Sequence, residues 1–215
     1  MFGTHDLWLF VISGLLLSVT PGPDTLYIVG RSSTQGWRAG AVAALGIGVG
    51  TLVHICAAAL GLSALLAASA AAFTALKFIG AAYLLYVGIA LIRAAGGRRS
   101  AVTVVPRPAS VRAIFIQGFL TNVLNPKVAL FFLAFLPQFV GAESTSKPLA
   151  FLLLGAIFDF NGTIWNLAVA WSTAHLSAKF APSAAFKRWF NRCVGGVFIL
   201  IGIRLALAHE GLVKS

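Results

Sequence analysis

Acidic residues are scarce in this chain: five of its 215 residues are Asp or Glu, against 16 Lys and Arg. Cysteine is scarcer still, since Cys56 and Cys193 are the only two and neither belongs to a CxxC or zinc-ligand spacing. This excludes a disulfide framework and a cysteine-based metal centre. The sequence also lacks HExxH, GxSxG and any histidine cluster. It therefore predicts no enzyme, no metal site and no cofactor.

Apolar residues are abundant, at 59% of the chain against 10% charged, with a mean hydropathy of +0.93. Apolar runs near the ~20 residues that cross a bilayer recur along the sequence. We therefore expect an all-α membrane protein with a single polytopic domain over residues 1–215. The six predicted spans are 7–29, 41–66, 72–92, 113–139, 149–174 and 192–208. No cleaved signal peptide is expected, because residues 1–6 contain no positive charge.

The net charge of +11 is distributed unevenly between the loops. The loops after the first, third and fifth spans are basic, whereas the alternate loops carry almost no charged residues. The basic residues are Arg31, Arg38, Arg93, Arg98, Arg99, Arg107, Arg112, Lys179, Lys187, Arg188 and Arg192. By the positive-inside rule these loops are cytoplasmic and both termini are periplasmic. We interpret the charge as topology and contact with membrane lipids, and we expect no nucleic-acid partner.

An internal repeat is indicated by matched positions in the two halves of the chain. A shift of 103 residues places Pro23-Asp24 on Pro126-Lys127, and a shift of 115 places Gly80 on Gly195. The predicted organisation is repeat one at about 1–93, a cytoplasmic loop at about 94–112 and repeat two at about 113–215. Because each repeat has three spans, the second copy must enter the membrane from the other side, so the repeats are inverted.

Two predicted spans are broken at proline, the first at Pro21-Gly22-Pro23-Asp24 and the fourth at Asn125-Pro126-Lys127. Breaks in a span are tolerated only where protein or a water-filled cavity surrounds them. We therefore predict a substrate site here, with Asp24 facing an ammonium group, Lys127 facing a carboxylate, and Pro21, Gly22, Pro23, Asn125 and Pro126 shaping the helix ends. The alternative is that Asp24 and Lys127 only neutralise each other.

Two further intramembrane groups are candidates for carrying a proton, Asp159 and His54. Asp159, Thr163 and Asn166 fall on one helical face, which predicts either a cavity lining or a polar seam between helices. His54 could equally serve as an interhelical hydrogen-bond partner. The glycines at positions 46, 50, 195 and 202 predict close helix packing rather than a phosphate loop.

The residues at and after the two breaks resemble those of a known family. The chain is similar to the LysE/RhtB family of bacterial inner-membrane amino-acid exporters. The similarity lies in Thr20-Pro21-Gly22-Pro23-Asp24-Thr25-Leu26, in Asn122-Val-Leu-Asn125-Pro126-Lys127 and in the Phe131–Phe139 segment that follows. The resemblance implies export of amino acids or derivatives such as homoserine, threonine, leucine or lysine, by proton antiport. Thr51 stands where many members carry an acid, three positions before His54, which favours a neutral substrate.

Two other functions stay open at this point. A membrane channel for small solutes would need no counter-ion. A membrane thiol-disulfide carrier also has proline-broken spans, but it needs cysteines at the breaks, and this chain has none there. The sequence also leaves open whether the protein forms a homodimer.

Overall fold

A computed structural model describes residues 2–64, 70–94, 108–141, 144, 146–176 and 184–207. Every element within these ranges is helical, and their one extended pairing is an isolated bridge between Thr4 and Val140. The expectation of an all-α protein is confirmed for this part of the chain. Most of the predicted cytoplasmic loop, from residue 95 to residue 107, lies outside the described residues.

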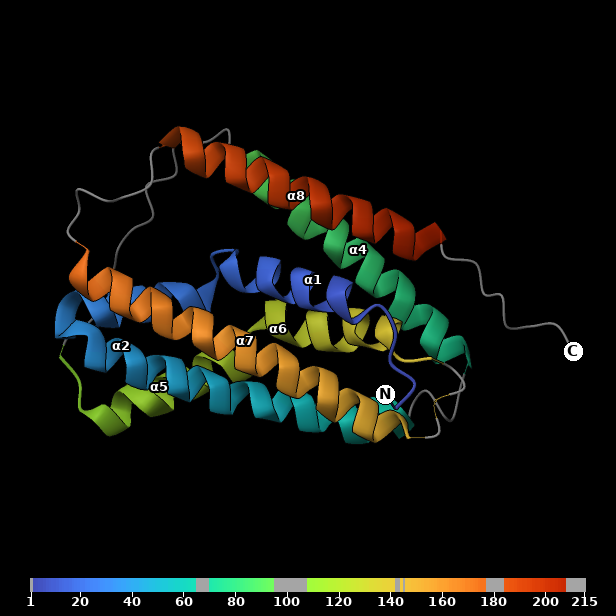
Figure 1. The fold of residues 1–215 in the computed structure, drawn as a ribbon, viewed down its shortest axis with the longest axis horizontal. Helices are drawn as coiled ribbons and strands as arrows, with labels where there is room; N and C mark the ends of the chain where they lie inside the picture. The colour runs from blue at the N-terminus through green and yellow to red at the C-terminus, as the bar shows by residue number, and fades with distance from the viewer. Residues whose placement is uncertain are drawn as a thin grey trace, which may run out of the picture. The chain divides into compact units, whose positions relative to one another are not determined.

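The chain forms two compact units. The larger unit combines Met1–Leu65 with Ser100–Ala181, and the smaller combines Leu66–Arg99 with Pro182–Ser215. The elements of the larger unit are α1 Leu7–Val19, α2 Pro23–Ala57, the π-helical turn η1 Ala58–Leu62, α5 Val111–Val123, α6 Pro126–Leu130, the π-helical turn η2 Phe131–Phe135, the 3₁₀ turn η3 Leu136–Phe139 and α7 Lys147–His175 (Figure 1).

Helix α2 reverses direction at Gly36. The backbone of Gly36 lies at φ 81° and ψ 177°, a conformation that is essentially restricted to glycine. In a straight helix Ser32 and Gly40 would be about 12 Å apart, but here the Ser32 hydroxyl packs directly against Gly40. The two limbs of α2 therefore lie side by side. They correspond to the end of the first predicted span and to the second.

The two proline motifs both lie between helices. α1 ends at Val19, and Pro23 is the first residue of α2; α5 ends at Val123, and Pro126 is the first residue of α6. Proline suits a first helical position because its missing N–H would have no partner there. Each motif therefore starts a new helix, and the charged residue after each proline occupies the second helical position. A bend of 43° separates the α5 helix from the segment Pro126–Phe139.

The second limb of α2 packs closely on α5 through small residues. A Cβ on Gly118 would lie 2.6 Å from the Ala43 carbonyl oxygen, and one on Gly50 would lie 2.8 Å from Asn122. Gly46 meets the Phe115 carbonyl in the same way. The predicted packing role of Gly46 and Gly50 is confirmed. This close approach brings Asn122 against α2.

Arg31 differs from its predicted place in a cytoplasmic loop. It lies within α2 and is buried. Its guanidinium donates to Gln117 Oε1 at 2.7 Å and to Gln35 Oε1 at 3.0 Å, while Gln35 in turn bonds the Ala109 backbone. Arg31 thus fastens the first limb of α2 to the start of α5. Its position is explained by hydrogen bonding within the protein rather than by lipid contact.

Phenylalanines fill the space beside the second broken segment. Phe131 lies 4.7 Å from Phe158 and 6.1 Å from Phe10 between ring centroids, and Phe139 lies 5.1 Å from Phe10. The N-terminal residues are attached at the same end, since His5 N–H donates to the Phe139 carbonyl at 3.1 Å and the Ser144 hydroxyl donates to the Phe2 carbonyl at 2.7 Å.

The smaller unit consists of α4 Ala70–Ala94 and α8 Ala184–Leu207, which pack together. A Cβ on Gly88 would lie 2.6 Å from the Gly195 carbonyl oxygen, and a Cβ on Gly195 would lie 2.6 Å from the Gly88 carbonyl oxygen. A Cβ on Gly202 would lie 3.1 Å from the Ala81 carbonyl. The predicted packing role of Gly195 and Gly202 is confirmed, because their lack of a side chain lets the two backbones approach.

Two described helical segments are long and apolar enough to cross a membrane, Pro23–Leu62 and Lys147–His175, and the bent pair Val111–Val123 with Pro126–Phe139 would be a third. Shorter apolar helices occur at Leu7–Val19, Ala81–Arg93 and Asn191–Ile203. The six spans and the inverted repeat stay predictions.

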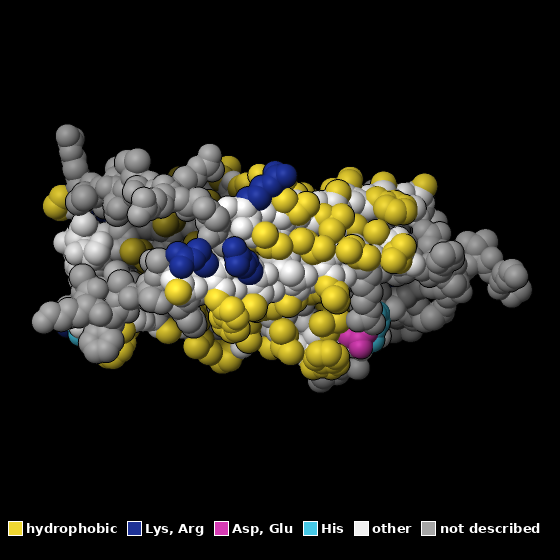
Figure 2. Space-filling model, turned by 90° about the horizontal axis from the view of Figure 1, so that it is seen from above, with side chains coloured by type: hydrophobic (Ala, Val, Ile, Leu, Met, Phe, Trp, Pro, Cys, Tyr) yellow, Lys and Arg dark blue, Asp and Glu magenta, His cyan; other side chains and the backbone are white. Residues whose placement is uncertain are grey.

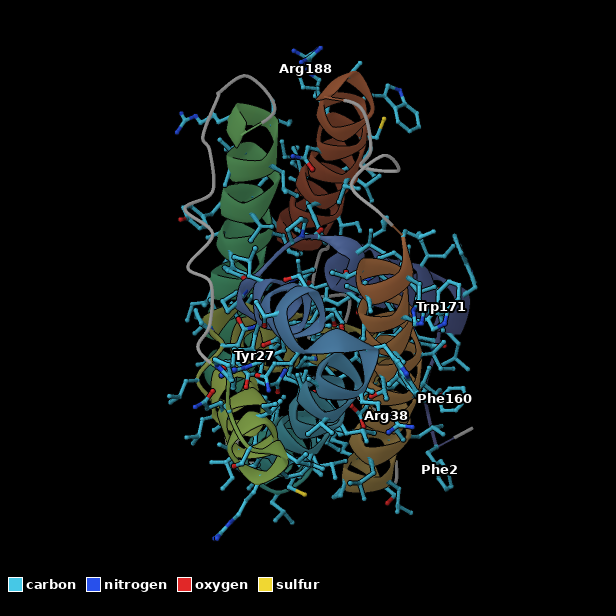
Figure 3. The ribbon with its side chains drawn as sticks, turned by 90° about the vertical axis from the view of Figure 1, so that its left-hand side faces the viewer. Phe2, Tyr27, Arg38, Phe160, Trp171 and Arg188 are labelled. Atoms are coloured by element: carbon cyan, nitrogen blue, oxygen red, sulfur yellow. The ribbon has the colours of Figure 1, made fainter. Side chains whose placement is uncertain are left out.

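Hydrophobic side chains cover much of the described surface on the face in Figure 2. Figure 3 shows Phe160 and Trp171 projecting outward from α7, where they are 67% and 55% exposed.

Candidate functional site

A cavity of about 40 Å³ lies inside the larger unit, next to the first break. Helices α1, α2, α5, α6 and α7 line it with Leu17, Ser18, Asp24, Thr25, Ile47, Gly48, Thr51, Asn122, Lys127, Val128, Phe158, Asp159, Gly162, Thr163 and Asn166. At about 10–15 Å³ for each water centre, this space holds a few water molecules. This volume is smaller than an amino acid.

Lys127 approaches the end of α1. Its Nζ donates to the backbone carbonyl of Thr20 at 2.7 Å, and its stem passes 3.4 Å from where a Cβ on Gly22 would lie. The second position of a helix disfavours a positive charge, because the helix dipole is positive at that end. The ammonium group instead lies at the C-terminal end of α1, where the dipole is negative.

Asp24 is held by an amide from the other broken segment. Asn122 Nδ2 donates to Asp24 Oδ2 at 2.8 Å, while Asp24 Oδ1 is buried and has no hydrogen-bond partner. The second position of α2 suits a carboxylate, because the dipole there is positive. Asp24 is thus stabilised by a helix start and by the Asn122 amide, and the Asn125 side chain also lies beside it. Its Oδ1 has no hydrogen bond of ordinary geometry to the residues that the structure describes.

Asp24 and Lys127 line the same cavity without forming an ion pair. Among the residues that the structure describes, the one pair within 4.0 Å is His5 with Asp6. Each charge reaches across to the other broken segment: Lys127 to the last turn of α1, and Asp24 to the last turn of α5. Each of these two charges therefore has a partner other than the opposite charge.

The polar stripe of α7 lines the opposite wall. Asp159, Thr163 and Asn166 all line the cavity, as their helical spacing predicts, and Gly48 of α2 lies against Asp159 and Thr163. A Cβ on Gly48 would be 2.9 Å from Thr163 Oγ1 and 3.5 Å from Asp159 Oδ1. Asn161 lies elsewhere, beside Phe10 and Phe158, and donates to the Ile157 carbonyl of its own helix at 2.9 Å.

His54 does not line the cavity. Its Nε2 lies 3.0 Å from the Asn122 carbonyl oxygen, and its ring stacks on Phe132 at 5.9 Å between centroids. A carbonyl only accepts, so Nε2 carries the proton in this contact. Thr51 lies one turn earlier, buried, with its hydroxyl 3.3 Å from Asn122 Oδ1. Both side chains of α2 therefore converge on Asn122.

The remaining predicted site residues shape the breaks without lining the cavity. Asn125 is buried and caps α6, because its Oδ1 accepts from the Lys127 N–H at 3.0 Å. Pro21, Pro23 and Pro126 are exposed. Gly22 has no side chain, which leaves space for the aliphatic part of the Lys127 side chain. Asn122 was not predicted as a site residue. Asn122 stands three residues before Asn125, at the end of an interrupted span, and this position could have identified it as a site residue.

Comparisons with known proteins place the chain among transporters. The family described as LysE type translocator matches residues 15–209. The chain is 30% identical over 209 residues to an uncharacterized membrane protein of Pseudomonas aeruginosa, covering 96% of this chain and 97% of that protein.

Two further relatives extend this comparison. The chain is 26% identical over 208 residues to the leucine efflux protein of Salmonella typhimurium, covering 95% and 96% of the two chains. It is also 26% identical over 211 residues to an uncharacterized membrane protein of Bacillus subtilis, covering 95% and 100%. No solved structure matches the chain. The chain is a membrane protein and belongs to the LysE type translocator family.

Proposed function

We propose that this protein exports a neutral amino acid or a close derivative from the cytoplasm in exchange for protons. The observation that carries the proposal is the placement of Asp24 and Lys127 on one cavity without an ion pair between them. Asp24 binds the α-ammonium group and Lys127 binds the α-carboxylate. Membership of a translocator family supports transport in general.

The residues at the breaks define the shape of the proposed site. Pro21, Gly22 and Pro23 end one helix and start the next, and Asn125 with Pro126 does the same in the second broken segment. Freed helix ends with opposite dipoles suit a zwitterion, as broken helices do in other transporters. We infer that the two breaks belong to inverted three-span repeats that meet at the bilayer midplane.

A neutral substrate is favoured by the rest of the lining. Thr51 contributes a hydroxyl to the cavity, and Leu17, Ile47, Val128 and Phe158 contribute apolar surface. Relatives named leucine efflux protein share about a quarter of their residues with this chain. A proton gradient is the driving force we infer, with Asp159 on the cavity wall and His54 behind Asn122 as candidate carriers.

The proposal is tested by efflux from cells that overproduce the protein. Cells are loaded with a panel of amino acids that includes leucine, threonine, homoserine and lysine, and efflux is measured with and without a proton-gradient uncoupler. Faster efflux of one or more neutral amino acids, slowed by the uncoupler, is the expected result. Efflux that is unaffected by the uncoupler would instead indicate a channel.

The two charges are tested by substitution. Asp24→Asn and Lys127→Met should each abolish efflux and leave a folded protein, because each deletes a charge that the substrate needs in a low-dielectric cavity. A structural ion pair predicts otherwise: single changes would lower stability, and the double variant would recover both fold and efflux. Near wild-type efflux by the double variant contradicts the proposal, and a stable but inactive double variant supports it.

A further inference from the structure

Asn122 is the point at which three parts of the larger unit meet. It is 1% exposed. Its Nδ2 donates to Asp24 Oδ2 at 2.8 Å, its Oδ1 lies 3.3 Å from the Thr51 hydroxyl, and its backbone carbonyl accepts from His54 at 3.0 Å. Gly50 leaves the space for it, since a Cβ there would lie 2.8 Å from Asn122 Cβ. The amide therefore has a fixed place directly beside the Asp24 carboxylate.

The Asp24 carboxylate is half satisfied in this arrangement. Oδ2 accepts the amide of Asn122, but Oδ1 is buried without a partner. A buried ionised group whose hydrogen bonds are incomplete is costly. Either a proton or an ammonium group would supply the missing interaction at this carboxylate.

The surroundings of Asn122 can satisfy both states of Asp24. With an ionised carboxylate, the amide NH₂ faces Asp24 and the amide oxygen accepts from Thr51. With a protonated carboxyl, a half-turn of the amide lets its oxygen accept from Asp24 and its NH₂ donate to Thr51. The Thr51 hydroxyl then donates to the Ile47 carbonyl, which is already 3.2 Å away. Asn122 and the Thr51 hydroxyl therefore keep hydrogen-bond partners in both states.

We propose that a proton and the substrate's ammonium group compete for the Asp24 carboxylate, and that Asn122 is the positioning residue that holds this carboxylate in both states. The inference rests on the proposed function. When an ammonium group binds, the proton leaves Asp24 to water, so one site accepts one cation at a time. Exchange then follows from mutual exclusion at Asp24, and the exchanged proton is carried by Asp24 itself rather than by Asp159 or His54.

Other titratable groups face Asp24 from the helices packed around it. Lys127 comes from α6, His54 from the second limb of α2, and Asp159 from α7 across the cavity. Helix α1 contributes Leu17 and Ser18, which do not titrate in this range. Lys127 and His54 donate to backbone carbonyls at 2.7 and 3.0 Å, and Asp159 faces the hydroxyls of Thr163 and Thr51. Asp24 Oδ1, in contrast, is buried without a hydrogen bond of ordinary geometry to the described residues. Asp24 is therefore the group best placed to take the proton.

The first test follows the Asp24 carboxyl by infrared titration of the purified protein. The band that is lost in Asp24→Asn reports this group. Asn122→Leu keeps the side-chain bulk but removes the hydrogen bond to the ionised carboxylate, so the protonated band should persist to higher pH. Asn122→Ser keeps a donor on a shorter side chain, so its titration should fall between those of wild type and Asn122→Leu. Asn161→Leu is the matched control, because Asn161 bonds only its own helix, and its titration should match wild type.

Two results of this titration would overturn the inference: no titrating band is lost in Asp24→Asn, or Asn122→Leu titrates like wild type. The titration uses no substrate, so it tests the role of Asn122 even if the protein binds no amino acid. Failure to bind an amino acid would contradict the proposed function but not this result.

The second test measures proton release. L-Leucine, or the best amino acid of the efflux panel where it differs, is added to weakly buffered protein at a pH where Asp24 is protonated. One proton should be released per ligand bound, and the apparent Kd should rise about tenfold for each pH unit below the midpoint of the carboxyl titration. Binding without proton release contradicts competition. If Asp159→Asn or His54→Gln binds the amino acid but releases no proton, the replaced residue carries the exchanged proton, and the assignment to Asp24 is wrong.

Discussion

At the residue scale, the same side-chain type plays different parts according to its neighbours. Asp24 and Asp159 are both carboxylates on the cavity, but Asp24 lies at a helix start beside the amides of Asn122 and Asn125. Asp159 lies within the long helix α7 beside the hydroxyls of Thr163 and Thr51. Arg31 is basic like the loop arginines, yet it is buried in a hydrogen-bond network. Chemistry at each position is therefore set by contacts rather than by residue type.

Gly36 provides a prediction at this scale. Replacing it with alanine forces a Cβ into a backbone conformation that L residues rarely adopt, so Gly36→Ala should lower the free energy of unfolding by about 1–3 kcal/mol. Gly196→Ala is the control, because Gly196 lies in α8 with open space around it, and alanine favours a helix over glycine. Thermal stability in detergent reports both. Equal stability of the two variants would contradict the assigned reversal at Gly36.

At the element scale, the site depends on helices that end early. The two breaks place the ends of α1 and α5 inside the larger unit, and each supplies a partner for the charge of the other segment: the Thr20 carbonyl for Lys127 and the Asn122 amide for Asp24. The close contact between α2 and α5 then sets how near Asn122 comes to Asp24. The packing of α2 against α5 therefore controls the distance between the Asn122 amide and the Asp24 carboxylate.

Gly118 tests this link between packing and site. Its Cβ in Gly118→Ala would lie 2.6 Å from the Ala43 carbonyl, so α5 must move away from α2. We expect a loss of about 1–3 kcal/mol in stability, together with reduced efflux, because Asn122 moves with α5. Gly196→Ala again serves as the control, with unchanged efflux. Wild-type stability and efflux in Gly118→Ala would show that the helices are not fixed at this contact.

At the scale of the whole molecule, one testable quantity is the orientation in the membrane. The N-terminal residues lie at the same end of the larger unit as Val140, Gly141 and Ser144, while Gln35 joins Ala109 just before α5. The bias of basic residues predicts that the first end is periplasmic and the second cytoplasmic. Both termini are therefore expected outside the cytoplasm in a bacterial inner membrane.

Cysteine labelling tests this orientation. In a background with Cys56→Ala and Cys193→Ala, an impermeant thiol reagent added to intact cells should label Phe2→Cys and should not label Pro108→Cys, both of which replace exposed residues. Pro108→Cys should label once the membrane is opened. The reverse pattern would invert the topology without affecting the fold of the larger unit.

Much of this protein could be read from its sequence, because bulk hydrophobicity, proline and glycine act locally. The apolar composition determined an all-helical membrane protein, the prolines determined where helices start, and the motif residues indicated the translocator family. Helical spacing also placed Asp159, Thr163 and Asn166 on one face. These features depend on the residues themselves and on neighbours within a few positions.

Only the tertiary structure decided which groups meet. The reversal at Gly36 brings Thr51 and His54 back to the first break, and the contact of α2 with α5 delivers Asn122 to Asp24 over a sequence separation of 98 residues. The structure also separated Asp24 from Lys127, although their charges alone favour a pair, because each finds a partner at the end of the other broken helix. Such contacts arise from packing between distant segments, and no local pattern encodes them.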